Sequence, residues 1–209
     1  MDEVYETKGK IFKVIVIGDK SVGKTAIVNR YTKNEFYNKY QSTIGADFYS
    51  KKVEFGYESV KLDIWDLSGD EKYNQLFNAY SKDIKGCFIV YDISKKESFD
   101  NLNKKFNLIK NIAEFENRDI AIILVGNKKD LEEERKVTTK EGEEFANKMG
   151  CLFFETSAQN NENINEIFEK MLNEINTLVP KPQQPKANIK TIKLIEKPEE
   201  INQGSYYCY

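Results

Sequence analysis

The stretch that decides the fold is Gly18-Asp19-Lys20-Ser21-Val22-Gly23-Lys24-Thr25, which matches the pattern G-x-x-x-x-G-K-[ST]. A short β-branched run precedes it and a helical pattern follows it. A glycine-rich turn in this context exposes backbone N–H groups that can wrap a phosphate. Lys24 adds a positive charge, and Thr25 adds a hydroxyl for Mg²⁺. The stretch predicts a nucleoside triphosphate site, a feature that ATPases and nucleotide kinases share.

Short apolar runs alternate with helical patterns on both sides of this loop, and a hairpin is expected around Gly56. Such alternation indicates an α/β fold, a six-stranded and mostly parallel sheet with helices on both faces. The expected strands are residues 11–17, 51–55, 60–65, 87–91, 120–125 and 151–154. The expected helices are residues 24–31, 98–115, 139–149 and 163–178. Phosphate ligands then bind at the carboxyl ends of the strands.

The proline distribution sets the expected domain boundaries. All four prolines lie beyond residue 179, so the preceding chain is free to form regular elements. We predict a flexible N-terminus over residues 1–9, one domain over residues 10–179, and a flexible, mildly basic tail over residues 180–209.

Composition excludes several chemistries. The chain has no histidine, which rules out a Ser-His-Asp triad and any His-ligated metal. Its cysteines, Cys87, Cys151 and Cys208, are too few and too dispersed for a disulfide framework and favour a reducing, cytosolic compartment. A net charge of -2 gives no indication of nucleic-acid binding, and no apolar run is long enough to span a bilayer.

Two further motifs predict the base. Asn127-Lys128-Lys129-Asp130 follows the strand 120–125, and a carboxylate there can accept both N1–H and the exocyclic amine of guanine. Adenine would leave that buried acid unsatisfied. The next strand leads into Glu155-Thr156-Ser157-Ala158, whose backbone N–H groups can meet the guanine O6. The two loops together favour guanine.

Two more motifs belong to the outer phosphates. Asp66-Leu67-Ser68-Gly69 ends a predicted strand, so Asp66 can hold Mg²⁺ and the Gly69 N–H can meet a γ-phosphate. Thr43 lies in the connection before the hairpin and supplies a second hydroxyl for Mg²⁺ when triphosphate is bound. That arrangement is typical of a switch.

These motifs, in this order over residues 10–178, resemble the Ras-like small GTPases. The segments 44–48, 61–66 and 90–99 closely resemble the Rab family of vesicle traffic. The resemblance implies a P-loop G domain that binds Mg²⁺ with GTP or GDP, hydrolyses GTP and acts as a trafficking switch. The implied nucleotide-binding residues are Ser21, Val22, Gly23, Lys24, Thr25, Ala26, Phe36, Tyr40, Thr43, Gly69, Asn127, Lys128, Asp130, Ser157, Ala158 and Gln159.

The same resemblance assigns further roles. Phe36 packs against the guanine, Tyr40 lies over the phosphates, and Thr25, Thr43 and Asp66 hold the metal. The implied effector-facing patch consists of Ile44, Phe48, Trp65 and Tyr80, although Ile44 and Phe48 can equally be ordinary packing residues. The implied partners are an exchange factor, an activating protein, effectors, and a GDP-dissociation inhibitor or prenylation escort. We expect a monomer that binds no nucleic acid.

The chain departs from the family near the γ-phosphate. The family usually has glutamine after Asp-x-x-Gly, to orient the attacking water, and this chain has Asp70. Aspartate is shorter, cannot donate when ionised, and brings negative charge toward the phosphate, so slow hydrolysis is expected. The family also prefers a small residue at Lys20. The catalytic candidates are therefore Lys24 and Gly69 with Asp70 and Lys20.

Two interpretations of Lys20 remain open. It can act together with Asp70, by pairing with it or by supplying charge to the γ-phosphate, or it can point to solvent. If these departures abolish chemistry, the alternative function is a hydrolysis-deficient guanine-nucleotide-binding scaffold for membrane effectors. A nucleotide kinase is a distant third, because it leaves Thr43 and the Asn127–Asp130 motif unexplained.

The C-terminus also departs from the family. Rab chains generally end in two prenylatable cysteines, whereas this chain ends Ser205-Tyr206-Tyr207-Cys208-Tyr209. Residues 192–195 resemble the aliphatic segment that prenylation escorts grip, which supports lipidation of Cys208. A single prenyl chain holds a membrane weakly and reversibly. We therefore expect a cytoplasmic protein that cycles to the cytosolic face of an intracellular membrane.

Overall fold

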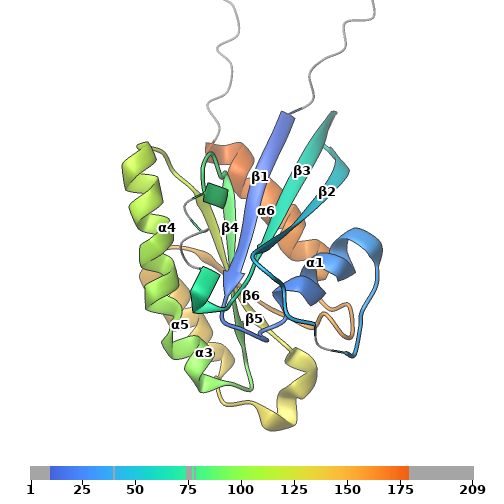
Figure 1. Ribbon diagram of the computed structural model, residues 1–209, viewed down its shortest axis with the longest axis vertical. Coiled ribbons are helices and arrows are strands. Elements are labelled where there is room, and N and C mark those ends of the chain that lie inside the picture. The colour runs from blue at the N-terminus through green and yellow to red at the C-terminus, as the bar shows by residue number, and fades with distance from the viewer. Residues whose placement is uncertain (1–9, 40, 74–76, 78, 179–209) are drawn as a thin grey trace, which may run out of the picture.

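Figure 1 presents the computed structural model, which describes residues 10–39, 41–73, 77 and 79–178. The predicted N-terminal segment, the tail with Cys208, and Tyr40 lie outside the described residues, so the expectations for them stay predictions. None of the helices described here has the length and apolar character needed to cross a membrane.

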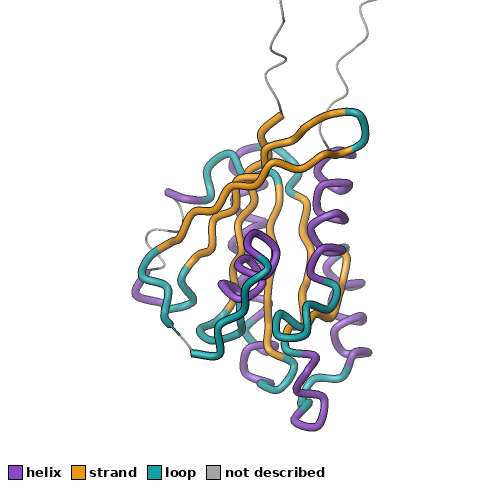
Figure 2. The backbone as a smooth tube through the Cα atoms, turned by 90° about the vertical axis from the view of Figure 1, so that its right-hand side faces the viewer, coloured by secondary structure: helices purple, strands orange, loops and turns teal. Residues whose placement is uncertain are grey.

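The sheet has six strands in the order β2-β3-β1-β4-β5-β6. Only β2 and β3 pair antiparallel, and the other neighbours are parallel. The predicted six-stranded, mostly parallel sheet is thus confirmed. Figure 2 shows the β2–β3 hairpin with its teal turn near the top. The strand bounds are Lys10–Gly18 (β1), Ala46–Phe55 (β2), Glu58–Leu67 (β3), Gly86–Asp92 (β4), Ala121–Asn127 (β5) and Leu152–Thr156 (β6).

Helices cover both faces of the sheet (Figure 1). One buried cluster packs α1 and α6 against side chains such as Val14 and Phe88, and a second packs α4 and α5 against side chains such as Ile15 and Ile89. Alternate residues of one strand therefore enter opposite cores, which explains the almost continuously apolar strands. The α-helices are Lys24–Lys33 (α1), Lys96–Asp100 (α3), Leu102–Glu116 (α4), Thr139–Met149 (α5) and Ile164–Leu178 (α6), and the 3₁₀ helices are Glu71–Tyr73 (η1) and Lys129–Glu134 (η2).

The strand register brings the sequence motifs together. Asp92 of β4 pairs with Asn127 of β5, and Asn127 pairs with Thr156 of β6. On the other side of β4, Val90 pairs with Gly18, where the phosphate loop begins. The carboxyl ends of four parallel strands therefore form one edge, at the end of the domain opposite the start of β1 and the end of α6 (Figure 1).

Two predicted elements differ from the structure. The single helix expected over residues 98–115 is divided at Asn101, whose side-chain amide donates to Asp19 of the phosphate loop (2.8 Å). The strand expected to start at residue 51 begins at Ala46, because pairing with β3 continues as far as Leu67. Local propensity cannot reveal either feature, since both depend on contacts distant in sequence.

The start of α5 generates a stability prediction. Glu141 accepts from the Lys96 ammonium (2.8 Å) and from the Thr138 backbone N–H (2.8 Å), and the Thr138 hydroxyl accepts from the Glu141 N–H. The hydrogen bond from Lys96, followed by those from Thr138, lowers the pKa of Glu141 from 4.5 to about 2. This capping box therefore contributes stability above about pH 4.5, which is lost as the pH falls toward 2.

We expect Glu141→Gln to lower the free energy of unfolding by about 0.5 kcal/mol at pH 7, since the carboxylate is exposed and partly screened. The difference from wild type should shrink as the pH falls below about 4.5. Urea unfolding across pH values measures it, with Glu144→Gln as the control because Glu144 makes only a 3.8 Å exposed pair with Lys140. A difference that is constant with pH would contradict the ionised cap.

Candidate nucleotide site

A cavity of about 570 Å³ opens at the carboxyl edge of the sheet. It is large enough for a small-molecule ligand. The phosphate loop and α1 form one wall, and the segment before β2 forms another. The lining residues are Lys20, Ser21, Gly23, Lys24, Thr25, Ala26, Asn29, Phe36, Tyr37, Asn38, Lys39, Gln41, Ser42, Thr43, Ser68, Gly69 and Lys128.

Lys24 is the buried cation of this cavity. Its ammonium donates to the backbone carbonyls of Gly18 (2.9 Å) and Asp19 (2.8 Å), and the residue is 6% exposed. Burial lowers the pKa of Lys24 to about 8, against an opposing contribution from the Asp66 carboxylate. A bound anion would favour the charged form, so this position suits a phosphate.

Two glycines allow backbones to approach where no side chain fits. Gly23 has φ of 97°, and a Cβ there would lie 2.2 Å from Nδ2 of Asn127. A Cβ on Gly69 would lie 2.4 to 2.6 Å from backbone atoms of Asp19 and Lys20. The phosphate loop is thus packed directly against the end of β5 and the residues that follow β3, where a side chain would not fit.

Three oxygen groups meet at one end of the cavity. The Thr25 hydroxyl donates to Oδ2 of Asp66 (2.5 Å) and lies 2.9 Å from the Thr43 hydroxyl, which is 3.4 Å from the same carboxylate oxygen. Burial raises the pKa of Asp66 to about 6, opposed by the Thr25 hydrogen bond and by Lys24. Within the described chain, Oδ1 of Asp66 is buried and meets no hydrogen-bond donor.

This donor set fits a hard cation such as Mg²⁺. In the described ranges, no three acidic, cysteine or histidine side chains form a metal cluster. A cation here would therefore take one carboxylate and hydroxyl groups, together with phosphate oxygens, as is usual for Mg²⁺ with nucleotides. Thr25, Thr43 and Asp66 are the residues that would hold it.

The motifs predicted to recognise the base are connected through Asn127, which is 1% exposed. Its Nδ2 donates to the Val22 carbonyl (2.9 Å), and its Oδ1 accepts from the Thr156 hydroxyl (3.1 Å). Close by, the Ser157 hydroxyl donates to Oδ1 of Asp130 (2.5 Å). The two loops predicted to meet the base are therefore in direct contact with each other and with the phosphate loop.

Arg30 of α1 continues this connection. Its guanidinium donates to the carbonyls of Ala158 (2.9 Å) and Gln159 (3.1 Å) and lies 5.8 Å from the Phe36 ring centroid. On the other side, the Lys128 ammonium is 2.7 Å from the buried carboxylate of Asp92. Phe36 and Lys128 both line the cavity.

Comparison with known proteins agrees with this geometry. The sequence model of the Ras family matches residues 13–177. The Ras-related protein Rab-11C of Dictyostelium discoideum is 42% identical over 169 residues, 81% of this chain and 74% of the relative. Rab-12 of Homo sapiens is 41% identical over 169 residues, 80% of this chain and 68% of the relative. Rab11D of Nicotiana tabacum is 40% identical over 171 residues, 82% of this chain and 76% of the relative.

The chain belongs to the Rab family of small GTPases. This family membership accounts for a GTP-binding fold whose motifs follow successive strands. It does not account for Asp70 and Lys20, which are unusual for the family. In the structure Asp70 pairs with Lys72, whereas Lys20 lines the cavity.

The two unusual residues of this Rab protein, Asp70 and Lys20, do not pair with each other, so one of the open interpretations of Lys20 is not met. The Asp70 carboxylate is 3.0 Å from the Lys72 ammonium and accepts from the Lys72 N–H (3.2 Å), so Asp70 caps η1. The hydrogen bonds from Lys72 lower the pKa of Asp70, whereas Lys20 makes the smallest contribution. Lys20 is exposed and lines the cavity. Lys72 is the partner of Asp70 because it lies only two residues farther along the chain.

Among the side chains predicted to face effectors, Phe48, Trp65 and Tyr80 form one group. Ile44 is 79% exposed and Phe48 is 51% exposed. The Trp65 ring lies 5.0 Å from Phe48 and 4.9 Å from Tyr80, measured between ring centroids. A continuous aromatic row therefore crosses β2, β3 and the residues after η1. Because Phe48 is half exposed, packing in the core does not by itself explain this side chain.

Sequence reasoning missed Asn29, which lies in the cavity wall and is 9% exposed. Its spacing of four residues from Thr25 places it on the same face of α1, which was the available signal. It also missed the clamp on Asp19, whose carboxylate accepts from Asn101 (2.8 Å) and lies 3.2 Å from the Lys105 ammonium. No sequence pattern signals that clamp.

The oxygen cluster generates a metal prediction. We expect Thr25→Val to lower the Mg²⁺ affinity of the GDP complex by about 10- to 100-fold, because one cation ligand is lost. GDP release should then be fast even with Mg²⁺, and chelation should accelerate it little. Release of a fluorescent GDP with and without chelator measures this.

The matched control is Thr32→Val, since Thr32 lies on the same helix and donates to the Val28 carbonyl (2.7 Å). That variant should respond to the chelator as wild type does. An unchanged chelator response in Thr25→Val would contradict the assignment of the cation.

Proposed function

We propose that this Rab-family protein is a GTP/GDP switch in intracellular vesicle traffic, with slow intrinsic hydrolysis. The observation that carries the proposal is the meeting of Thr25, Thr43 and Asp66 at a cavity that Gly69 also lines. Thr43 lies before β2 and Gly69 after β3. A γ-phosphate with its Mg²⁺ would hold both segments, and hydrolysis would release them.

Slow hydrolysis follows from the state of Asp70. Its pairing with Lys72 keeps the carboxylate ionised and directs it to η1. An ionised carboxylate cannot donate a hydrogen bond to the γ-phosphate oxygens, and it repels them. Two positive groups of the phosphate loop also belong to the cavity, Lys24 inside it and Lys20 at its surface. In this proposal they stabilise charge without orienting the attacking water.

The trafficking role rests on family membership together with the exposed aromatic row. Effectors would bind Ile44, Phe48, Trp65 and Tyr80 when GTP fixes the flanking segments. An exchange factor, an activating protein and a GDP-dissociation inhibitor or prenylation escort would control the cycle. We propose that the protein moves between the cytoplasm and the cytosolic face of a membrane, through Cys208 if that cysteine is lipidated.

The Asp70 assignment predicts a gain of activity. Asp70→Gln restores a neutral donor at the position that the family uses to orient water, so we expect at least about tenfold faster hydrolysis of bound GTP. Single-turnover phosphate release measures it, with Asp63→Asn as a surface-carboxylate control on β3. A rate unchanged by Asp70→Gln would contradict the assignment, and no detectable hydrolysis by either protein would favour the scaffold alternative.

The position of Lys20 gives a second prediction. Because Asp70 pairs with Lys72 and Lys20 is exposed, Lys20→Ser and Asp70→Gln should change the rate independently. The double mutant should show the product of the two single effects. A rate that differs from this product by more than about threefold would restore direct coupling of Lys20 and Asp70.

A further inference from the structure

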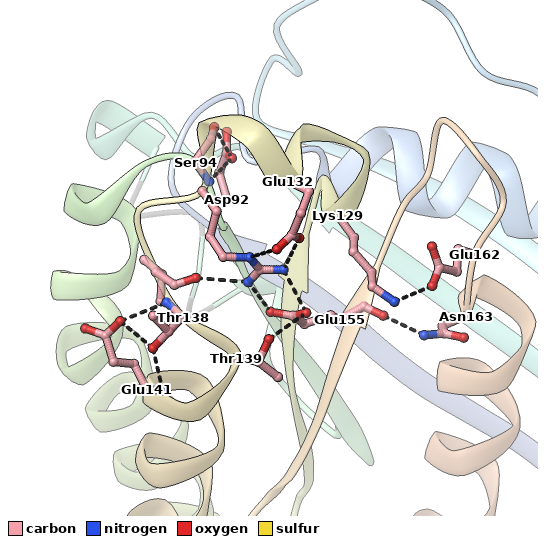
Figure 3. A network of polar contacts seen from close by, with 12 residues as sticks. Asp92, Ser94, Lys129, Glu132, Thr138, Thr139, Glu141, Glu155, Glu162 and Asn163 are labelled. Carbon is pink, nitrogen blue, oxygen red and sulfur yellow. Dashed lines mark hydrogen bonds and ion pairs between the residues drawn. The ribbon is translucent and has the colours of Figure 1, made fainter.

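An ion pair between Lys129 and Glu162 connects the two loops predicted to hold the base. Lys129 begins η2 and directly precedes Asp130, and Glu162 lies between β6 and α6. Figure 3 shows the Lys129 ammonium directed at the Glu162 carboxylate across the gap between these segments. The pair therefore joins two segments 33 residues apart in the chain.

Glu162 is in turn tied to Ser157 by the backbone. The Glu162 N–H donates to the Ser157 carbonyl (2.9 Å), and the Ser157 N–H donates to the Glu162 carbonyl (3.2 Å), as in an isolated antiparallel bridge. The Ser157 hydroxyl then donates to Asp130 (2.5 Å). Lys129, Glu162, Ser157 and Asp130 thus form a closed ring of contacts. Movement of Asp130 away from Ser157 would break this ring.

A second link joins Arg135 to Glu155 of β6 and has a different character. The Arg135 guanidinium donates to the Glu155 carboxylate (2.6 and 3.0 Å) and to Glu132 (2.6 and 2.9 Å). Figure 3 shows Glu132 and Glu155, the two acidic partners, and Thr139, whose hydroxyl donates to Glu155 (3.2 Å). The Arg135 and Glu155 side chains are 13% and 8% exposed. Removing that link would leave a buried charge, so it serves folding.

We propose that the Lys129–Glu162 ion pair is a positioning clasp for Asp130, which lengthens the residence time of guanine nucleotide. This inference rests on the proposed guanine-binding role of Asp130. The two side chains are 37% and 41% exposed, so either can be replaced without burying an unpaired charge. The same exposure makes the clasp sensitive to ionic strength.

The test is the dissociation rate of fluorescent GDP from the full chain in excess unlabelled GDP. Lys129→Met and Glu162→Gln should each release GDP about twofold to fivefold faster, the range for one exposed ion pair. The exchanged pair, Lys129→Glu with Glu162→Lys, should restore the wild-type rate. Lys140→Met and Glu144→Gln, an exposed pair within α5, should leave the rate unchanged.

Two readouts separate positioning from a general loss of structure. Inosine diphosphate lacks the exocyclic amine whose hydrogen bond Asp130 is proposed to accept. A misplaced Asp130 should therefore shorten the residence time of GDP more than that of inosine diphosphate, and the ratio of the two times should fall in the clasp variants. Raising the salt from about 50 to about 500 mM should speed release from wild type more than from the single variants. A general loss of structure would accelerate the release of both nucleotides equally and would lower the melting temperature.

Unchanged GDP release in both single variants would overturn the clasp, as would failure of the exchanged pair to restore the rate. Both results leave the proposed function intact, because wild type still retains GDP. Failure of wild type to bind GDP would overturn the proposed function and this inference with it.

Discussion

The site depends on the Asn127 side chain, which bonds simultaneously to the phosphate loop and to the end of β6. Its amide nitrogen holds the Val22 carbonyl, and its amide oxygen holds the Thr156 hydroxyl. Both bonds are buried, so losing either partner would leave a polar group without compensation. The register of β4, β5 and β6 places Asp92, Asn127 and Thr156 side by side, and the Asn127 side chain connects the end of β6 to the phosphate loop.

The charged side chains at the other end of the cavity, Lys24 and Asp66, are less stable in their charged forms in the protein alone than they would be beside a charged ligand. Both side chains are buried. Burial lowers the pKa of Lys24 and raises the pKa of Asp66, and both shifts favour the neutral form. A phosphate beside Lys24 and a cation beside Asp66 would reverse both shifts. Ligands that bind only the folded chain add to its stability by mass action. Nucleotide with Mg²⁺ would therefore stabilise the fold as well as use it.

Much of this architecture was predictable because it depends on local patterns. Buried strands are nearly continuously apolar, and each motif follows one of them, so the sheet and the grouping of Lys24, Asp66, Asn127 and Asp130 followed from sequence. Pairings between surface side chains were not predicted. Asp70 pairs with the nearby Lys72 and not with Lys20, and Lys129 pairs with Glu162, 33 residues away. Such choices depend on the exact paths of loops, which hydrophobic periodicity does not encode.

The central claim is that GTP stays in this cavity while its γ-phosphate is slowly lost. The most direct test preloads the protein with GTP that carries separate labels on the guanine moiety and the γ-phosphate, in the presence of Mg²⁺. The account predicts that the phosphate label leaves slowly while the guanine label remains bound. Loss of both labels together would mean that GTP dissociates before hydrolysis and would contradict a switch timed by its own chemistry.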